Sequence, residues 1–251
     1  MGKYLKEFDT HQQYIAYTAD TSNFITPNVS YCIDTPNEVH YNPYVDPYAG
    51  HEYVEIGGLK WATMNVGATS ITDTGLYFQW GDTQGYTADQ CGSGEGQKYF
   101  GWADYKYCSG AGTSSSAITK YNDTDGKTVL EASDDAAQVN WGGSWRMPTT
   151  DEFVALGTAV STAYTNDYQG SGVAGLICTD KTDNSKVLFF PDTAYCYKGS
   201  VYYWTRGYYW SSSFYVISPQ KAYQVDTYNK KVGWKSNGER VGGATVRPVV
   251  G

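Results

Sequence analysis

Concentrated positive charge and long apolar runs are both missing from this sequence. Its 251 residues carry 18 Lys and Arg against 26 Asp and Glu, a formal net charge of -8, and no basic cluster is denser than Lys230-Lys231. Proteins that bind phosphate backbones present basic patches, so we expect no nucleic-acid partner. No stretch approaches the ~20 apolar residues of a membrane-spanning helix, and the first ten residues lack the apolar run of a signal peptide. We therefore expect a soluble chain with no membrane insertion.

Residue types that carry catalysis are also sparse. All three histidines, His11, His40 and His51, precede the expected body of the main domain, so no Ser/His/Asp or Cys/His group can be assembled within it. The five cysteines have no tight metal-type spacing, and their odd number leaves at least one unpaired. Free thiols in a protein made in the cytoplasm are the simpler interpretation, and a Cys91 to Cys108 bridge is the alternative. We predict no enzyme activity and no cofactor.

Tyrosine and tryptophan are abundant, with 25 Tyr and 8 Trp against 8 Phe. Both side chains combine a large apolar ring with a polar group, so an excess over Phe favours amphipathic rings at surfaces. The alternative is that many of them fill a strand-rich core.

Two parts of the chain differ in composition. Residues 1–50 contain four of the eight prolines, which is typical of an extended N-terminal arm or attachment module, although residues 11–17 are compatible with a short helix. Such an arm docks on a neighbour more often than it catalyses, so it is a candidate contact for a homo-oligomer such as a trimer, or for another neighbouring protein. Residues 51–251 form the main domain.

Local patterns predict mostly strands and loops within the main domain. Thr149 or Thr150 is expected to cap the best helix, with Phe153, Val154 and Leu156 on its buried face. Residues 133–139 predict one further helical turn, capped by Ser133 or Asp134. A long ordered loop is expected over residues 85–125. Strands are predicted within residues 52–62, 75–82, 174–179, 186–190, 223–228 and 231–235.

Alternation near the C-terminus predicts a hairpin with one buried face and one free face. Tyr223, Val225 and Thr227 have one parity, and after a turn at Asn229-Lys230 the residues Val232 and Trp234 continue the buried side. Aromatic anchors among polar groups on the other face are typical of an adaptable binding surface, whereas the simpler interpretation is an ordinary solvated face. The predicted ligand-binding residues are Tyr197, Tyr203, Trp204, Phe214, Val216, Gln224, Asp226, Tyr228, Lys231, Gly233, Lys235, Asn237 and Glu239.

Five segments in order carry a resemblance to a known family. They are residues 60–68 (KWATMNVGA), 77–82 (YFQWGD), 134–149 (DDAAQVNWGGSWRMPT), 209–213 (YWSSS) and 246–249 (VRPV). Together they resemble the Fibrobacter succinogenes major paralogous domain, which is similar in fold to the formylglycine-generating-enzyme branch of C-type lectin-like domains. The resemblance covers roughly residues 52–250. It implies an α+β, C-type lectin-like fold of short antiparallel strands, one or two helices and long ordered loops.

The resemblance also implies a function. Many such domains are variable proteins of diversity-generating retroelements, in which mutagenesis rewrites codons near the C-terminus and the scaffold holds the altered side chains on a ligand-binding surface. Here that region would be about 195–245, and the target a cell-surface protein or glycan. The N-terminal arm resembles leaders of virion proteins from phages of gut Bacteroidales. We therefore expect a receptor-binding protein on a virion, made in the host cytoplasm; a bacterial surface or pilus-tip adhesin is the alternative.

Several tryptophans and two arginines lie in apolar surroundings in the sequence. Trp61, Trp80, Trp141, Trp145 and Trp210 lie beside small residues and are predicted to be core. Arg146 and Arg247 are expected to pair with buried carbonyls or with a carboxylate such as Asp134 or Asp135, because an unpaired buried charge is costly.

Calcium binding is left open by oxygen-rich segments at 122–126 and 180–184, which are predicted to be turns. An oxidase of the formylglycine-generating type is the remaining alternative, but no close cysteine pair is evident in the sequence.

Overall fold

The computed structural model describes residues 48–109, 117–203, 206–228 and 231–251, without the side chains of Tyr228 and Lys231, and the backbone of three strands before them. The chain divides into two compact units, residues 1–50 and 51–251. In the first unit, β1 (Glu7–Phe8), β2 (Tyr31–Thr35) and β3 (Glu38–Asn42) form a sheet in which β1 is parallel to β2 and β3 is antiparallel. The helix expected at residues 11–17 lies outside the described residues.

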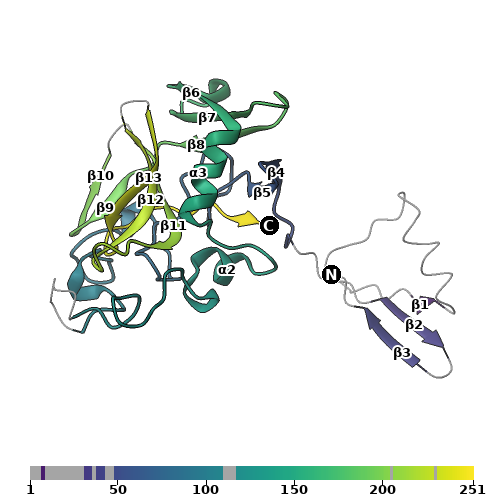
Figure 1. Cartoon of the computed structure of the whole chain (residues 1–251), viewed down its shortest axis with the longest axis horizontal. Coiled ribbons are helices and arrows are strands. Elements are labelled where there is room, and N and C mark those ends of the chain that lie inside the picture. The colour runs from purple at the N-terminus through teal and green to yellow at the C-terminus, as the bar shows by residue number, and fades with distance from the viewer. Residues whose placement is uncertain are drawn as a thin grey trace. The chain divides into compact units, whose positions relative to one another are not determined.

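The second unit is strand-rich, with antiparallel sheets and two α-helices in its described part (Figure 1). This agrees with the expected α+β class. The helices are α2 (Ala136–Trp141) and α3 (Thr150–Ala159), and short 3-10 turns are η1 (Ala88–Gln90), η2 (Trp102–Asp104), η4 (Ala132–Asp134) and η5 (Tyr168–Gly170). The strands are β4 (Tyr53–Ile56), β5 (Leu59–Ala62), β6 (Val160–Thr165), β7 (Gly175–Asp180), β8 (Val187–Pro191), β9 (Tyr195–Tyr197), β10 (Ser200–Tyr202), β11 (Tyr208–Phe214), β12 (Lys221–Tyr228), β13 (Lys231–Glu239) and β14 (Val249–Val250). Their sheet orders are β14-β5-β4, β6-β7-β8, β10-β9 and β11-β12-β13.

Helix α3 begins at the predicted cap. The Glu152 backbone N–H donates to Thr149 Oγ1 at 3.3 Å and the Glu152 carboxylate accepts from the Thr149 N–H at 2.7 Å, so two otherwise unpaired donors are satisfied. Phe153 and Leu156 are buried as expected. The predicted burial of Val154 is wrong: it is exposed, because it lies off the helical stripe that Phe153 and Leu156 define.

Helix α2 is capped by a residue other than the two predicted. Asp135 Oδ1 accepts from the N–H groups of Ala137 and Gln138 at 2.9 and 3.0 Å, and its other oxygen accepts from the Met147 N–H at 2.8 Å. Ser133 and Asp134 belong to the preceding turn η4. The predicted cap is therefore wrong by one residue, because the 3-10 turn delays the start of the helix.

The strand predicted at residues 75–82 is wrong. In this segment Tyr77 and Phe78 make only isolated bridges, to Tyr86 and Ala244. The Trp80 N–H then donates to the Arg240 carbonyl, and Gly81 turns the chain with a φ of 81°. The segment is consequently a buried irregular connection rather than part of a sheet.

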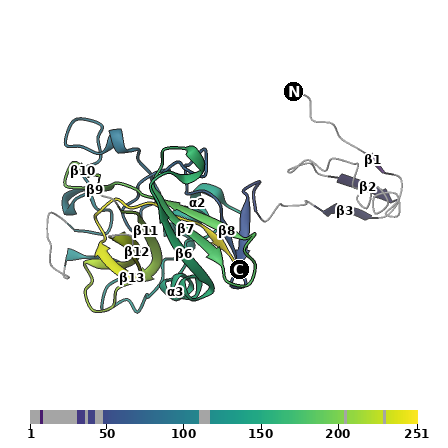
Figure 2. The same cartoon turned by 90° about the horizontal axis from the view of Figure 1, so that it is seen from above.

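The β11-β12-β13 sheet separates two hydrophobic cores. Successive strand residues point to opposite faces, and the neighbours Tyr209 and Trp210 are both fully buried, one in each core. The first core contains Trp80, Trp210, Phe214 and Ala222. The second lies between this sheet, α3 and the β6-β7-β8 sheet, which are neighbours in both views (Figures 1 and 2).

Four of the five predicted core tryptophans are fully buried: Trp61, Trp80, Trp145 and Trp210. Trp141 is only half-buried, and its ring stacks on His51 with centroids 3.5 Å apart.

The fully buried Arg247 is satisfied by hydrogen bonds to uncharged oxygens. Arg247 donates to the carbonyls of Ala62 and Phe189 at 3.1 and 2.9 Å and to Asn65 Oδ1 at 2.8 Å, which confirms the expected pairing with carbonyls. Burial lowers the pKa of Arg247 to about 10, so it stays charged at neutral pH. Arg146 also has the expected kinds of partner, a carboxylate and a carbonyl, since it pairs with Glu152 at N–O distances of 2.6 and 2.8 Å and donates to the Met147 carbonyl at 3.3 Å. The carboxylate is that of Glu152 rather than Asp134 or Asp135, the two named examples.

Candidate ligand-binding surface

The predicted hairpin is present, and a β-bulge divides it. Strands β12 and β13 pair Gln224 with Ser236 and Asp226 with Gly233, so two residues of β13, Trp234 and Lys235, lie opposite Val225 alone. A bulge of this kind places one extra residue in a strand and interrupts its alternation. Everything in β13 beyond residue 234 is therefore shifted by one position relative to the predicted register.

The side expected to be buried is confirmed. Val225 is buried, and Val232 and Trp234 pack against the second core. The Trp234 ring lies so close to α3 that a Cβ on Gly157 would be 2.5 Å from it, which is too short for any side chain there. These contacts fix the hairpin on α3.

Lys235 is exposed but does not lie on the predicted face. Its Nζ lies 5.4 Å from the centre of the Tyr223 ring, and Tyr223 shares the parity of Val225. The bulge is the physical reason, because it brings Lys235 to the same side as Trp234. The predicted grouping of Lys235 with Gly233 is therefore wrong. The same shift applies to Asn237 and Glu239, which pair with Tyr223 and Lys221, residues of the Val225 parity, instead of sharing the side of Gly233.

Two other predicted site residues are not on a free surface. Gln224 is 5% exposed and Phe214 is 4% exposed. The prediction assumed a sheet covered on one face, whereas β11 and the adjoining half of β12 have a core on each face. Gln224 fills the space above Gly238, where a Cβ would lie 2.4 Å from its Oε1. The expected outward orientation of Gln224 and Phe214 is therefore wrong.

The other predicted residues have partial or full exposure where the structure describes them. Tyr203 and Val216 are 74% and 57% exposed. Half-buried side chains are Tyr197, Asp226, Asn237 and Glu239, together with Gly233. Trp204 and the side chains of Tyr228 and Lys231 lie outside the described residues.

A set of tyrosines stands beside this part of the hairpin. We call Tyr195, Tyr197 and Tyr208 the aromatic wall: the rings of Tyr195 and Tyr208 are 5.0 Å apart and those of Tyr195 and Tyr197 are 6.2 Å apart. The Tyr197 hydroxyl donates to Glu239 Oε2 at 2.8 Å, which joins β9 to the end of β13. The pKa of the Tyr197 hydroxyl is raised mainly by burial and also by its hydrogen bond to Glu239. The hydroxyl therefore remains a donor at neutral pH.

The aromatic wall meets the hairpin at Asp226. Tyr208 is the direct partner of Asp226 in the β11-β12 ladder, and the Arg206 guanidinium donates to the Tyr208 hydroxyl at 3.0 Å. Sequence reasoning missed Tyr195, Tyr208 and Arg206, although the spacing of Tyr195 and Tyr197 by two residues is a strand signal that places both on one face. The rings and one cation therefore lie with Asp226 at this end of the sheet. Glu239 pairs with Lys221 and lies at the other end of the hairpin, where Tyr197 reaches it.

Phe214 and Val216 belong to a different place. They line a shallow cavity of about 350 Å³ together with Asn122, Asp123, Gly126, Lys127 and Thr128. Phe214 and Tyr208 are at opposite ends of β11, and six residues of strand span roughly 20 Å. The thirteen predicted residues thus do not form one contiguous surface.

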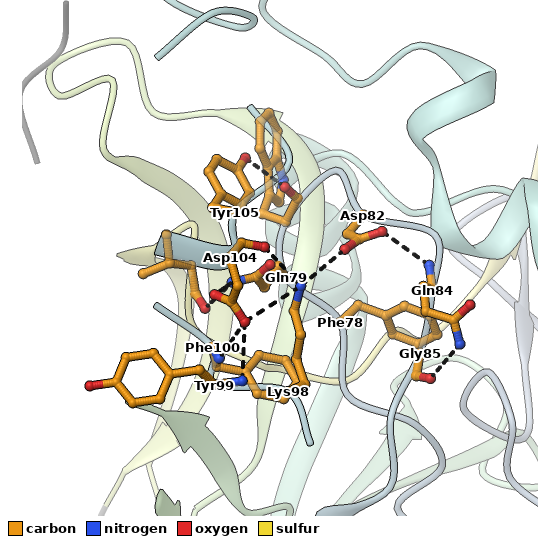
Figure 3. Close-up of polar contacts among 12 residues, drawn as sticks. Phe78, Gln79, Asp82, Gln84, Gly85, Lys98, Tyr99, Phe100, Asp104 and Tyr105 are labelled. Carbon is orange, nitrogen blue, oxygen red and sulfur yellow. Dashed lines mark hydrogen bonds and ion pairs between the residues drawn. The ribbon is translucent and has the colours of Figure 1, made fainter. Parts of the chain in front are cut away.

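A network of polar contacts orders part of the long loop (Figure 3). Asp104 accepts hydrogen bonds from the N–H groups of Tyr99, Phe100 and Gly101 at 3.1, 3.1 and 2.8 Å. The Gln79 amide also donates to Asp104, at 3.2 Å, and Lys98 Nζ lies 3.6 Å from carboxylate oxygens of both Asp104 and Asp82. The ordered loop is thereby held on the first core.

The same loop holds the turn of the β9-β10 hairpin. The N–H groups of Lys198 and Gly199 donate to the carbonyls of Phe100 and Tyr99, at 3.2 and 2.6 Å. The aromatic wall is therefore positioned from both sides, by the loop and by β13.

The oxygen-rich segments form turns, as predicted. Asp180 Oδ1 accepts from the N–H groups of Thr182 and Asp183, and Asn122 Oδ1 accepts from those of Thr124 and Asp125. Among the described residues, no group of three or more His, Cys, Asp or Glu side chains is arranged to hold a metal ion. None of the helices in the described part of the chain has the length and apolar character needed to cross a membrane.

The cysteine arrangement differs from the predicted alternative. Cys91, Cys108, Cys178 and Cys196 are not in disulfides, so the Cys91 to Cys108 bridge is absent. Cys91 instead contacts Cys196 of β9.

Known proteins add nothing to this geometry. No family model, curated protein or solved structure matches the chain. The functional interpretation therefore rests on the motifs in the sequence and on the surface described above.

Proposed function

We propose that this chain is a non-catalytic binding protein with a C-type lectin-like fold. Its ligand-binding surface comprises the aromatic wall and the adjacent residues of the β12-β13 hairpin, chiefly Asp226 and Glu239. The observation that carries the proposal is a row of half-buried aromatic, acidic and basic groups, joined through the buried Tyr208, that runs beside the sheet from Asp226 to Glu239. Rigid aromatic anchors beside polar groups are typical of protein and glycan recognition.

Contacts between the motif segments support the proposed fold. The Trp210 indole N–H donates to the Phe78 carbonyl and that of Trp80 donates to the Ser211 carbonyl, both at 2.8 Å. Asn65 accepts from Arg247, and the backbones of Arg146 and Val249 exchange two hydrogen bonds. All five segments that carry the family resemblance therefore take part in one set of packed contacts, as a fold-defining motif should.

We further propose that the region around 195–245 is diversified by a retroelement and that the protein is carried on a phage virion, with residues 1–50 as the attachment part. The supporting observation is the separation between core and surface in the hairpin: Val225 and Trp234 hold it, while Asp226 and Ser236 keep partial exposure. A surface of this kind can change its side chains without losing the fold. The alternative carrier is a bacterial surface or pilus tip.

A direct experiment separates tolerant positions from intolerant ones. Single-site saturation libraries at Asp226 and Ser236, displayed and selected for protease resistance, are expected to retain most substitutions. Matched libraries at Val225 and Ala222 in the same strand are expected to retain few, because both side chains are buried. Equal tolerance at all four positions would contradict the proposed surface.

Two further measurements test binding and diversification. Binding of the labelled protein to bacterial cells should be lost in the Tyr197→Ala, Asp226→Ala double variant while its thermal stability changes little; full binding by a folded double variant would refute the site. Sequencing the DNA beside the gene should reveal a near-copy of codons 195–245 that differs at adenines, next to a reverse transcriptase gene. Its absence would refute diversification without affecting binding.

One observation supports the oxidase alternative, namely that Cys91 lies in contact with Cys196. Both side chains are buried, at 8% and 0% exposure, and burial raises the pKa of both thiols. This environment disfavours the thiolate that such chemistry uses. Tight copper binding by the purified protein, lost in Cys91→Ser, would favour the oxidase over the binding function.

A further inference from the structure

Two cysteines from distant parts of the sequence meet beneath the aromatic wall. Cys91 follows turn η1 in the long loop, and Cys196 is the central residue of β9. Both belong to a buried cluster with Tyr77, Phe100 and Ala194, and each thiol lies close enough to the other to shift its pKa. Cys91 Sγ also donates to the Ser200 carbonyl in β10 at 3.4 Å.

The backbone on each side of this pair is fixed. The Cys91 N–H donates to the Ala88 carbonyl at 3.0 Å, and the backbone of Cys91 forms an isolated parallel β-bridge with that of Lys98. Cys196 exchanges two backbone hydrogen bonds with Gly243, at 3.1 and 2.7 Å, and a Cβ on Gly243 would lie only 2.8 Å from the Cys196 Cβ. Neither thiol can therefore be carried away from the other by movement of a loose loop.

We propose that Cys91 and Cys196 are a disulfide-forming pair that locks the β9-β10 hairpin to the long loop under oxidising conditions. A small-molecule disulfide such as oxidised glutathione supplies the oxidising equivalents. The Cys91 thiolate attacks this disulfide, releases one glutathione thiolate and forms a mixed disulfide. The Cys196 thiolate then attacks Cys91 Sγ and displaces the second glutathione, so two thiol protons and two electrons leave the protein pair.

The order of attack follows from exposure. Cys91 retains slight contact with solvent, whereas Cys196 has none. Burial raises the pKa of both thiols, so bond formation is slow at neutral pH and accelerates as the pH rises. The product closes a covalent ring of about 105 residues between positions 91 and 196.

The lock acts on the aromatic wall. Tyr195 and Tyr197 flank Cys196 in β9, so the bond would restrain the strand that carries both of them. This consequence rests on the proposed function only in so far as the wall binds a target. The covalent step itself is measured without any ligand.

The test begins with the unmodified full chain. The protein is incubated with oxidised glutathione, its remaining thiols are alkylated, and its peptides are mapped by mass spectrometry without reduction. A Cys91–Cys196 cross-linked peptide, lighter by two hydrogen atoms, is expected. Thermal unfolding should shift upward by roughly 5 to 15 °C and return on reduction, since closing a long ring restricts the unfolded chain.

Variants provide the matched controls. Cys178→Ser should leave both the cross-link and the shift unchanged, because Cys178 lies in the second core. Cys91→Ser, which keeps a donor for the Ser200 carbonyl, should abolish both. A Cys91–Cys108 cross-link, glutathione adducts without a cross-link, or unreacted thiols after oxidation at raised pH would each overturn the inference.

Discussion

Replacing Arg240 with methionine tests whether a buried cation organises the first core. The Arg240 guanidinium is fully buried and donates four hydrogen bonds of 2.8 to 2.9 Å, to the Tyr105 hydroxyl and to the carbonyls of Lys120, Tyr121 and Pro219. Its central carbon also lies 4.8 Å from the centre of the Trp80 ring. One side chain thus joins the loop before residue 125, the β11-β12 turn and the end of β13.

The expected loss follows from the groups that the substitution leaves unpaired. Two buried carbonyls and one partly buried carbonyl lose their donor, and each unsatisfied group costs roughly 1 to 3 kcal/mol. Removing the buried charge recovers part of this, because its desolvation penalty disappears, and methionine refills most of the volume. We expect Arg240→Met to lower the free energy of unfolding by about 3 to 5 kcal/mol, the lower part of the range that three unpaired carbonyls would give.

Urea denaturation followed by tryptophan fluorescence measures this loss, since Trp80 and Trp210 lie in the same core. The matched control is Arg146→Met, whose partly exposed pair with Glu152 should be worth at most about 1 kcal/mol. If the Arg240 and Arg146 variants lose the same small amount, the cation is not the organising contact of this core.

Three further predictions address other parts of the scaffold. Trp145→Ala should destabilise the protein by about 3 to 5 kcal/mol in the same assay, because the ring is fully buried, and a loss below ~1 kcal/mol would contradict its place in the core. Burial alone would raise the pKa of Asp134, but hydrogen bonds from Lys120, Tyr107, Tyr121 and Lys106 hold it well below its usual range. A lowered folded-state pKa stabilises the protein above the unfolded value of about 4, and this contribution is lost as the pH falls below that value. Asp134→Asn should therefore cost about 1 to 3 kcal/mol at pH 7, and its difference from the unmodified protein should shrink in acid; a constant difference would refute the assignment. Gly238→Ala should cost about 1 to 3 kcal/mol through collision with Gln224, and Gln224→Ala should relieve it in a double-mutant cycle, whereas additive losses would exclude the contact.

Local signals in the sequence were sufficient for several elements. The Thr149 and Glu152 spacing predicts the start of α3, and the alternation around Val225 predicts β12, because both depend on residues that are neighbours along one element. The strand at residues 75–82 was mispredicted, since its aromatic residues are buried by contacts with residues 240–244 rather than by a sheet. Strand β6 has no such signal, because half of its residues are exposed polar or small side chains.

The candidate surface was only partly predictable, for a different reason. The bulge at Trp234 and Lys235 is a property of how two strands pair, and neither strand alone contains it. The burial of Gln224 depends on a second core formed by residues far away in sequence. Arg240 was not singled out, because its carbonyl partners leave no charge pattern in the sequence.

The bulge also determines how this hairpin can change in length. It separates a base register, in which Gln224 pairs with Ser236, from a tip register, in which Asp226 pairs with Gly233. Adding or removing residues at the tip changes only the second register, because the base is fixed independently by its own ladder and by the buried neighbours of Ala222. Insertions and deletions near residues 229–230 should therefore be tolerated by the fold better than those within residues 236–239. The hairpin can vary in length as well as in its side chains, while its attachment to the domain stays the same.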